Sequence, residues 1–127
     1  MKSVFCSYKY EDKQWKEKLE SWAISNRLGP NIVITGESED VRQNGKNAVK
    51  RHLSPKLTGA SKILVLIGRD THNSTGVEYE IQHAMSAGKK VIPVRIPDTS
   101  GAAPQAISGK REIVFDPSAI RQELESW

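Results

Sequence analysis

Short apolar runs rich in β-branched residues alternate along this chain with longer stretches whose apolar positions recur at helical spacing. The runs are expected to form strands, and they cover residues 3–7, 31–35, 62–68, 90–96 and 112–115. Strands that alternate with helices in this way are typical of a parallel sheet. The pattern therefore predicts an α/β fold.

Two of these runs also predict where their strands lie in the sheet. Residues 63–67 are apolar without alternation, as expected of a central strand that is covered on both faces. Residues 113–115 are few enough for an edge strand. Pro93 falls inside the fourth run, where it removes a backbone donor, so either a bulge or a weakly paired side is expected there.

Three stretches between the runs carry apolar stripes at helical spacing and are expected to be helices packed on the sheet. The stripes consist of Trp15, Leu19, Trp22 and Ala23, then Val49 and Leu53, then Val77, Ile81, Ala84 and Gly88. Gly29 and Pro30 are expected to end the first helix, Ser54 and Pro55 to disturb the end of the second, and Gly88 to end the third.

The 127 residues are expected to form a single domain over residues 1–127. A lone cysteine, Cys6, excludes an internal disulfide, and the three histidines have no spacing typical of a metal site, so no metal is expected. No apolar run is long enough to span a bilayer, and the start of the chain lacks the features of a secretory signal. We therefore expect a cytoplasmic protein with no membrane partner.

The charge balance is mildly basic, with 19 Lys and Arg against 15 Asp and Glu and a net charge of +4, which suits anionic ligands. Arg42, Lys46 and Lys50 are spaced to share one helix face, with Arg51 beside them. This face is either simply solvated or attracts a pyrophosphate, an acidic partner or another subunit. It lacks the aromatic residues of a base-stacking surface, so no nucleic-acid partner is expected.

Several widespread chemistries lack their motifs in this chain. The P-loop pattern G-x-x-x-x-G-K-[ST] is absent, no G-x-G-x-x-G follows the first strand, and there is no G-x-S-x-G nucleophile elbow. Asp70 comes slightly late after the third run for the phosphoacceptor of a receiver domain. Cys6, inside a strand, is more typical of a small buried residue than of a nucleophile.

The candidate site is the segment 76–81, which places Glu78 and Glu80 at the start of a helix directly after the buried third strand. In open α/β sheets, ligands bind outside the carboxyl ends of the strands, near helix N-termini that favour phosphates. At about 100° per residue, Glu80 lies beside the stripe of Val77 and Ala84, and Glu78 lies on its opposite flank. From the residues alone, each could also be a surface carboxylate that stabilises the helix start.

Four motifs in register resemble those of Toll/interleukin-1 receptor (TIR) domains and together span most of the chain. They are the strand Val4-Phe5-Cys6-Ser7-Tyr8, the strand and its lead-in at 59–67, the glutamate-bearing helix segment 77–81, and the strand 88–94. The likeness is greatest to short bacterial TIR-like proteins, including the signal-producing component of the Thoeris antiphage defence system. The resemblance implies a flavodoxin-like three-layer sandwich with a five-stranded parallel sheet of order 2-1-3-4-5.

The resemblance also implies that NAD⁺ is the substrate, with no tightly bound cofactor. The bond between nicotinamide and ribose would be cleaved, and the ADP-ribosyl product hydrolysed, cyclised or transferred to give a nucleotide signal in antiviral defence. Glu80 corresponds to the catalytic glutamate of the family. Nicotinamide leaves as a neutral ring, so a carboxylate that stabilises the oxocarbenium ion can suffice without the general acid that glycosidases need.

Four further residues are expected to bind NAD⁺. Ser7, Tyr8 and Tyr10 follow the first strand and would contact ribose or phosphate by hydrogen bonds and a ring by stacking. Their alternative interpretation is a strand-end cap and core aromatic residues. Gly76 stands where many family members have tryptophan, and it is expected to let backbone N–H groups approach a phosphate closely.

The resemblance further implies a homo-oligomer, because TIR enzymes commonly complete their sites across subunits, and a downstream effector that reads the product. Two other functions stay open. A non-catalytic interaction module would assemble through the loop 36–40 and the face of Arg42, Lys46 and Lys50, and Gly76 is its best supporting feature. A nucleoside N-glycosidase related to deoxyribosyltransferases would use a similar fold and a glutamate.

Overall fold

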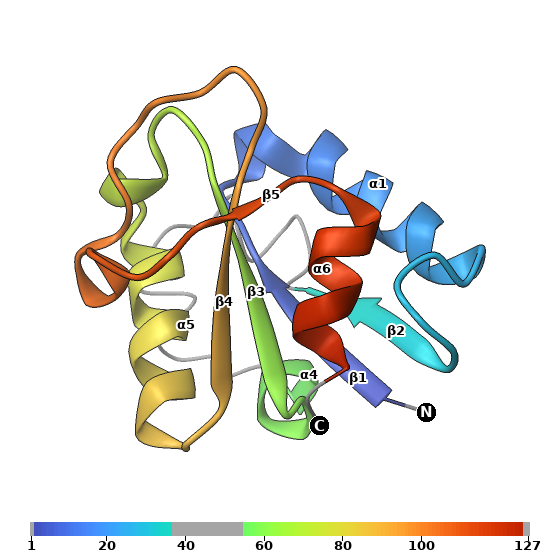
Figure 1. Ribbon diagram of the computed structural model, residues 1–127. Coiled ribbons are helices and arrows are strands. Elements are labelled where there is room, and N and C mark those ends of the chain that lie inside the picture. The colour runs from blue at the N-terminus through green and yellow to red at the C-terminus, as the bar shows by residue number, and fades with distance from the viewer. Residues whose placement is uncertain (1, 37–54, 126–127) are drawn as a thin grey trace.

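A five-stranded parallel sheet runs through the computed structural model, which describes residues 2–36 and 55–125 (Figure 1). Its strands are β1 (Lys2–Ser7), β2 (Ile32–Thr35), β3 (Lys62–Ile67), β4 (Lys90–Arg95) and β5 (Ile113–Val114). They lie in the order β2-β1-β3-β4-β5, and each neighbouring pair is parallel. The predicted α/β class and strand order are confirmed.

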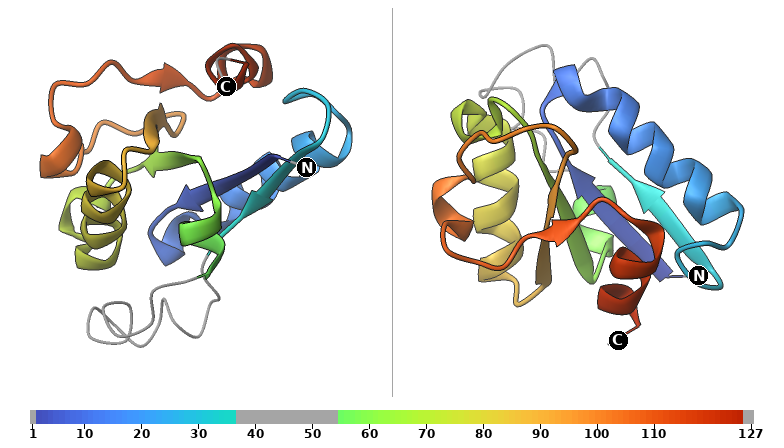
Figure 2. Two further views of the ribbon diagram at one scale, coloured as in Figure 1. Left: turned by 90° about the horizontal axis from the view of Figure 1, so that it is seen from below. Right: turned by 45° about the horizontal axis from the view of Figure 1, so that its top comes forward.

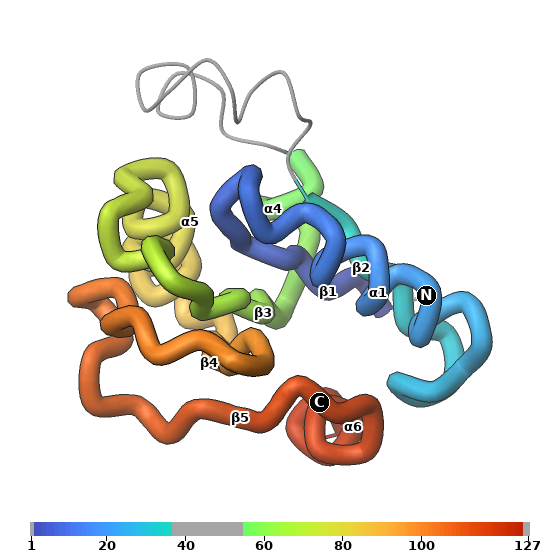
Figure 3. The backbone as a smooth tube through the Cα atoms, turned by 90° about the horizontal axis from the view of Figure 1, so that it is seen from above, coloured from blue at the N-terminus to red at the C-terminus, as the bar shows by residue number. Residues whose placement is uncertain are grey.

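Helices cover both faces of this sheet, which gives the predicted three layers (Figures 2 and 3). α1 (Lys13–Ile24) and α6 (Pro117–Leu124) pack on one face, and α5 (Thr75–Ser86) and α4 (Pro55–Gly59) pack on the other. Three single-turn 3₁₀ helices lie in the connections that the structure describes: η1 (Tyr10–Asp12), η2 (Thr71–Asn73) and η3 (Gln105–Ile107). None of the described helices is long and apolar enough to cross a membrane.

The alternation of side chains along β1 decides which layer each residue serves. Val4, Cys6 and Tyr8 pack in the core on the α1 side, whereas Phe5 packs in the core on the α5 side. Ser7 follows Phe5 by two residues and therefore also faces α5. β3 is buried along its whole length and lies in the middle of the sheet, as predicted, and β5 lies at the predicted edge.

Pro93 lies in a regular part of β4 and not in a bulge, since the pairing of β4 with β3 continues through it. The backbone N–H groups of Lys90 and Ile96 donate to carbonyl groups at β3, so the backbone N–H and C=O groups of the even-numbered residues of β4 point to that strand. The backbone of Pro93 therefore points to the other neighbour, β5, which pairs only with Val94 and Arg95. The expected weakly paired side is present, and it accommodates the missing donor.

The first helix ends earlier than predicted. α1 stops at Ile24 instead of at Gly29 and Pro30, because Asn26 adopts a left-handed conformation with φ 61°. The N–H groups of Asn26 and Arg27 donate back to carbonyl groups of the last helical turn, as in a Schellman motif. Asparagine tolerates this conformation better than most residues, so it can replace the usual glycine.

Gly88 ends the third predicted helix as expected. Its φ is 75°, and the N–H groups of Gly88 and Lys89 donate to the carbonyl groups of Met85 and Ala84. These two hydrogen bonds satisfy carbonyl groups that the end of α5 would otherwise leave without partners.

Two prolines lie at the start of described helical segments that the pattern does not predict. Pro55 is the first described residue of α4, and the helix end that it is expected to disturb lies outside the described residues. Pro117 begins α6, where the side chain of Asp116 caps the helix by accepting a hydrogen bond from the backbone N–H of Ala119. Proline suits the first helical turn because a backbone N–H at that position has no partner within the helix.

The predicted core stripes are confirmed where the structure describes them, except at Gly88, which is exposed and lies beyond the last residue of α5. Their fully packed members are Leu19, Trp22, Ala23, Val77, Ile81 and Ala84, and all are buried. Trp15 is partly buried, with its ring 5.2 Å from that of Phe115. The stripe of Val49 and Leu53 lies outside the described residues, as do Arg42, Lys46, Lys50 and Arg51 and all of the loop 36–40 except Gly36.

Candidate functional site

Ser7 and Glu80 meet at the carboxyl end of β1. Ser7 is the last residue of that strand, and its Oγ donates a hydrogen bond of 2.7 Å to Oε1 of Glu80 in α5. The two residues are 0% and 1% exposed. Leaving a buried polar group without a hydrogen bond is costly, so this pairing stabilises both groups. It holds a carboxylate at the edge of the sheet where ligands bind in this class of fold.

The position of Glu80 follows from the way α5 begins and packs. The side chain of Ser74 caps the helix by accepting a hydrogen bond from the backbone N–H of Val77. Val77, Ile81 and Ala84 then fill the core against the sheet. The rotation that buries this stripe also turns Glu80 inward, as its expected place beside the stripe implies.

Glu78, on the opposite flank of α5, makes a different set of contacts. Its Oε1 accepts a hydrogen bond of 3.1 Å from the backbone N–H of Ala106 and a longer one from the side chain of Gln82. Ala106 belongs to η3, so this carboxylate ties α5 to the segment that leads to β5. Of the two acids, Glu80 is therefore the one at the carboxyl end of β1.

The structure separates the three residues that are expected to share one crevice after β1. Tyr8 is 2% exposed and lies in the core on the α1 side, with its ring next to Gly36. Successive strand residues point to opposite faces, so Tyr8 is turned away from Ser7 and Glu80. The alternative interpretation of Tyr8, a core aromatic residue, is the one that the structure supports. The alternation of side chains along a strand would have predicted from the sequence that Tyr8 and Ser7 point to opposite faces.

Tyr10 and Gly76 have positions compatible with ligand contact. Tyr10 is 39% exposed and belongs to η1, which follows β1 closely. Gly76 lies in the first turn of α5 and is partly exposed. Its neighbour in the chain, Thr75, begins the helix, so backbone N–H groups of that first turn have no partners within the helix. The roles of Tyr10 and Gly76 in binding NAD⁺ stay predictions.

Asp12 is a buried acid that the sequence pattern does not single out. It is 9% exposed, and its Oδ2 has no hydrogen-bond partner within the described chain. A Cβ atom on Gly68 would lie only 2.7 Å from Oδ2, so the carboxyl group lies directly against the backbone after β3. Burial above all, and then the charge of Glu11, raise the pKa of Asp12 to about 6 against the opposing effect of Lys9.

The sequence around Asp12 does not indicate that its side chain is buried. It directly precedes α1, where an aspartate normally caps the helix, yet its side chain makes no capping hydrogen bond. An acid in a polar segment at a helix start looks like an ordinary cap. Only the packing of η1 against the end of β3 distinguishes it.

Lys9 connects the segment after β1 with the segment after β3. Its ammonium group contacts the carboxylates of both Asp70 and Glu11. The hydrogen bond that Lys9 donates to Asp70, and then one that Asn73 donates, lower the pKa of Asp70. The same Lys9–Asp70 hydrogen bond is the main cause of the raised pKa of Lys9. Asp70 is therefore engaged in an ion pair at the rim of the sheet. No cluster of three or more potential metal ligands occurs within residues 2–36 and 55–125.

The sheet order and the two helical layers are those of a TIR domain. The crystal structure of the TIR domain of the Toll-related receptor TRR-2 from Hydra magnipapillata matches with a TM-score of 0.66. The match covers 98% of this chain and 97% of that chain at 11% sequence identity, so it shows the fold alone.

The sequence defines the family more narrowly. The family model of the TIR-like domain of Thoeris protein ThsB matches residues 5–101, and the chain belongs to this family. A relative from Bacillus cereus (strain MSX-D12), named "Putative cyclic ADP-D-ribose synthase ThsB1", is 30% identical over 105 residues. This match covers 75% of the present chain and 52% of the relative, so the chain spans about half the length of that curated protein. The predicted likeness to the Thoeris TIR proteins is confirmed.

Proposed function

We propose that this domain cleaves NAD⁺ between nicotinamide and ribose and releases an ADP-ribose-derived nucleotide that acts as a signal in antiviral defence. The observation that carries the proposal is the buried Ser7–Glu80 pair at the carboxyl edge of the sheet, in a chain of the ThsB family. The name of the Bacillus relative, "Putative cyclic ADP-D-ribose synthase ThsB1", favours a cyclic product.

In the proposed reaction, Glu80 stabilises the positive charge that develops on the ribose as nicotinamide departs. A carboxylate does this best when it is already oriented and needs no rearrangement as the charge appears. The hydrogen bond from Ser7 supports that orientation by fixing Oε1. The surroundings of Glu80 exclude water, which strengthens the attraction between carboxylate and cation.

Access to Glu80 is part of the same proposal. The residue is 1% exposed, so NAD⁺ has to displace the atoms that cover the carboxylate before the ribose reaches it. Tyr10, at 39% exposed, is available to stack on a ring of the dinucleotide, and the first turn of α5 at Gly76 is available to a phosphate. Substrate binding is therefore expected to involve local opening at this edge.

The decisive experiment is mass spectrometry of small molecules after incubation of the purified protein with NAD⁺, alone and in an extract of phage-infected cells. The wild-type protein is expected to release nicotinamide together with a linear, cyclic or conjugated ADP-ribose. Glu80→Gln, which keeps the side-chain volume, is expected to lower this release by about 100-fold or more. Circular dichroism and thermal unfolding provide the control for folding.

Three outcomes would contradict the proposal. Full activity of Glu80→Gln would remove Glu80 from the mechanism. Turnover of deoxynucleosides without turnover of NAD⁺ would indicate a deoxyribosyltransferase-like enzyme. Assembly of the protein without any turnover, unchanged by Glu80→Gln, would indicate an interaction module.

We also propose that the active form is a homo-oligomer and that a separate effector protein reads the product. If the site is completed between subunits, specific activity should rise with protein concentration in the range where sedimentation shows association. Constant specific activity from monomer to oligomer would contradict a shared site.

A further inference from the structure

β4 has an open edge along two thirds of its length. β5 pairs only with Val94 and Arg95, so the part of β4 from Lys90 to Pro93 has no strand from the described chain on that side. Because the even-numbered residues of β4 face β3, the N–H and C=O groups of Val91 and the C=O group of Pro93 face this edge. An open edge of this kind can take an added strand from another chain.

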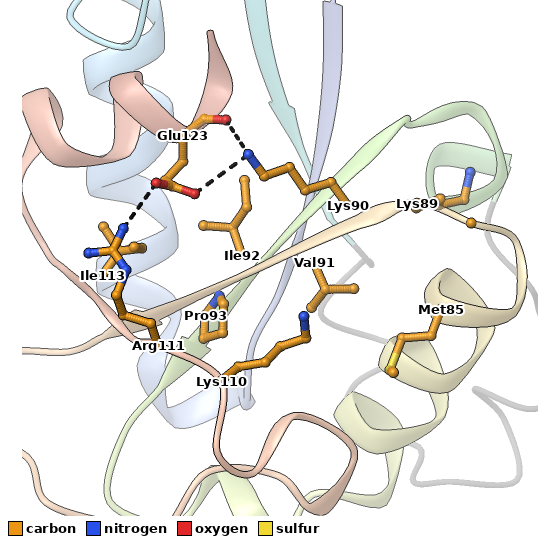
Figure 4. A pocket seen from close by; sticks show the side chains of 11 residues that line it. Met85, Lys89, Lys90, Val91, Ile92, Pro93, Lys110, Arg111, Ile113 and Glu123 are labelled. Atoms are coloured by element: carbon orange, nitrogen blue, oxygen red, sulfur yellow. Dashed lines mark hydrogen bonds and ion pairs between the residues drawn. The ribbon is translucent and has the colours of Figure 1, made fainter. Parts of the chain in front are cut away.

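A groove with an apolar floor runs along the same edge (Figure 4). Its volume is about 500 Å³, and its floor is formed by residues of β4 and by Ile113 of β5. Met85 of α5 lies at one end and is 46% exposed, which is high for so large an apolar side chain. Apolar side chains of a ligand would therefore be sheltered from water there.

The rim of the groove is positively charged. Lys110 is exposed and extends over the floor near Val91, and Arg111 follows it in the chain. Glu123 is the one acid among the described lining residues, and both Arg111 and Lys90 contact it, at 3.3 and 3.5 Å. The cations outnumber this acid, so the rim attracts negative charge.

We propose that this groove docks an extended acidic segment of a partner protein. The segment lies along β4 with its acidic side chains near Lys110 and Arg111 and its apolar side chains on the floor. Pro93 supplies no N–H, so Val91 is the backbone donor to the added segment and side chains provide most of the selectivity. The groove shares no residue with the Ser7–Glu80 site, so this inference does not depend on the proposed function.

The test uses the full chain and a fluorescein-labelled synthetic peptide in which glutamate alternates with valine. Fluorescence anisotropy is expected to show binding that weakens with added salt. Lys110→Glu is expected to weaken the binding by about tenfold, whereas Arg69→Glu, the same charge change at an exposed position outside the groove, leaves it unchanged. NMR should show a shift of the Val91 amide on peptide addition.

Each of the remaining outcomes overturns the proposal. One is that the glutamate peptide does not bind. Another is that a control peptide with lysine in place of glutamate binds as tightly as the glutamate peptide. A third is that Lys110→Glu binds the glutamate peptide as tightly as the wild-type chain does. Displacement of the peptide by inorganic pyrophosphate that shifts the same amides would indicate a small-anion site instead. Self-association that Lys110→Glu abolishes without a change in peptide affinity would make the occupant a second copy of this chain.

Discussion

The Oγ atom of Ser7 and the Oε1 atom of Glu80 lie 2.7 Å apart although their residues are 73 positions apart in the sequence. Ser7 comes from the end of β1 and Glu80 from α5, so the distance depends on how the sheet and the helix layer pack. A serine hydroxyl can donate one hydrogen bond, and here Oε1 of Glu80 accepts that bond. We therefore propose that Ser7 positions Glu80, and its expected hydrogen bond to ribose or phosphate stays a prediction.

Ser7→Ala tests this positioning role. We expect kcat for nicotinamide release to fall by about 10- to 100-fold with a smaller change in KM, because the carboxylate loses its fixed orientation. The free energy of unfolding should fall by about 1–3 kcal/mol, since a buried carboxylate loses its hydrogen-bond donor. Steady-state kinetics and urea unfolding measure the two effects. Ser7→Thr, which keeps a hydroxyl group, should recover part of kcat, and an increase in KM alone would instead indicate direct ligand binding.

Asp12→Asn should stabilise the protein at alkaline pH and have little effect near pH 4. The pKa of Asp12 is raised from 3.8 to about 6, so folding disfavours its ionised form. Stability is therefore lost as the pH rises from about 4 to about 6, and the loss is complete above the folded-state pKa. The full shift corresponds to at most about 3 kcal/mol, and we expect Asn to recover about 1–3 kcal/mol at pH 8.

Urea unfolding of wild type and Asp12→Asn between pH 4 and pH 8 provides the measurement. The difference in the free energy of unfolding between the two proteins should increase from about pH 4 to about pH 6 and then stay constant. A difference that is independent of pH would show that Asp12 is not the titrating group. Glu11→Gln is a suitable comparison, because it removes a neighbouring charge that raises the pKa of Asp12.

The fold was predictable because the signals for each strand are local. Residues 63–67 are apolar on both faces, as expected of a central parallel strand. The end of α1 was not predictable in the same way, because Asn26 and Gly29 are both able to adopt positive φ. Both do so in the structure, and the helix ends before the first of them. At Pro93 the sequence allows either a bulge or a weakly paired side. The structure has the weakly paired side, because β5 is too short to pair with this part of β4.

The candidate site was predictable only in part. The inward direction of Glu80 follows from helix rotation, and the separation of Tyr8 from Ser7 follows from strand alternation. The partnership of Ser7 with Glu80 follows from neither, because it depends on the packing of α5 against the end of β1. The burial of Asp12 has no local signal at all, since it arises from contact with Gly68 on another strand end.

Gly68→Ala should destabilise the protein through Asp12. The backbone of Gly68 has no positive φ, but an added Cβ would lie 2.7 Å from Oδ2 and 3.2 Å from Cγ of Asp12, so the acid has to shift. We expect a loss of about 1–3 kcal/mol in the free energy of unfolding, as for other overpacked sites. In an Asp12→Ala background the same change should cost about 1 kcal/mol less. Urea unfolding of the four proteins measures this coupling, and additive effects would contradict a direct contact.

Alanine substitutions at Tyr8 and Tyr10 should separate stability from substrate binding. Tyr8 is 2% exposed in the core, so Tyr8→Ala should lower the free energy of unfolding by about 3–5 kcal/mol. Tyr10 is 39% exposed, so Tyr10→Ala should change stability by no more than about 0.5 kcal/mol. If Tyr10 stacks on NAD⁺, its loss should raise KM by about 5- to 10-fold with kcat nearly constant.

Thermal or urea unfolding and steady-state nicotinamide release distinguish these effects. Tyr10→Phe is the matched control, because it keeps the ring and should keep the wild-type KM if stacking is the relevant contact. An unchanged KM in Tyr10→Ala would remove Tyr10 from the binding site. A wild-type stability of Tyr8→Ala would contradict its place in the core, because a cavity of that size has no compensating contact.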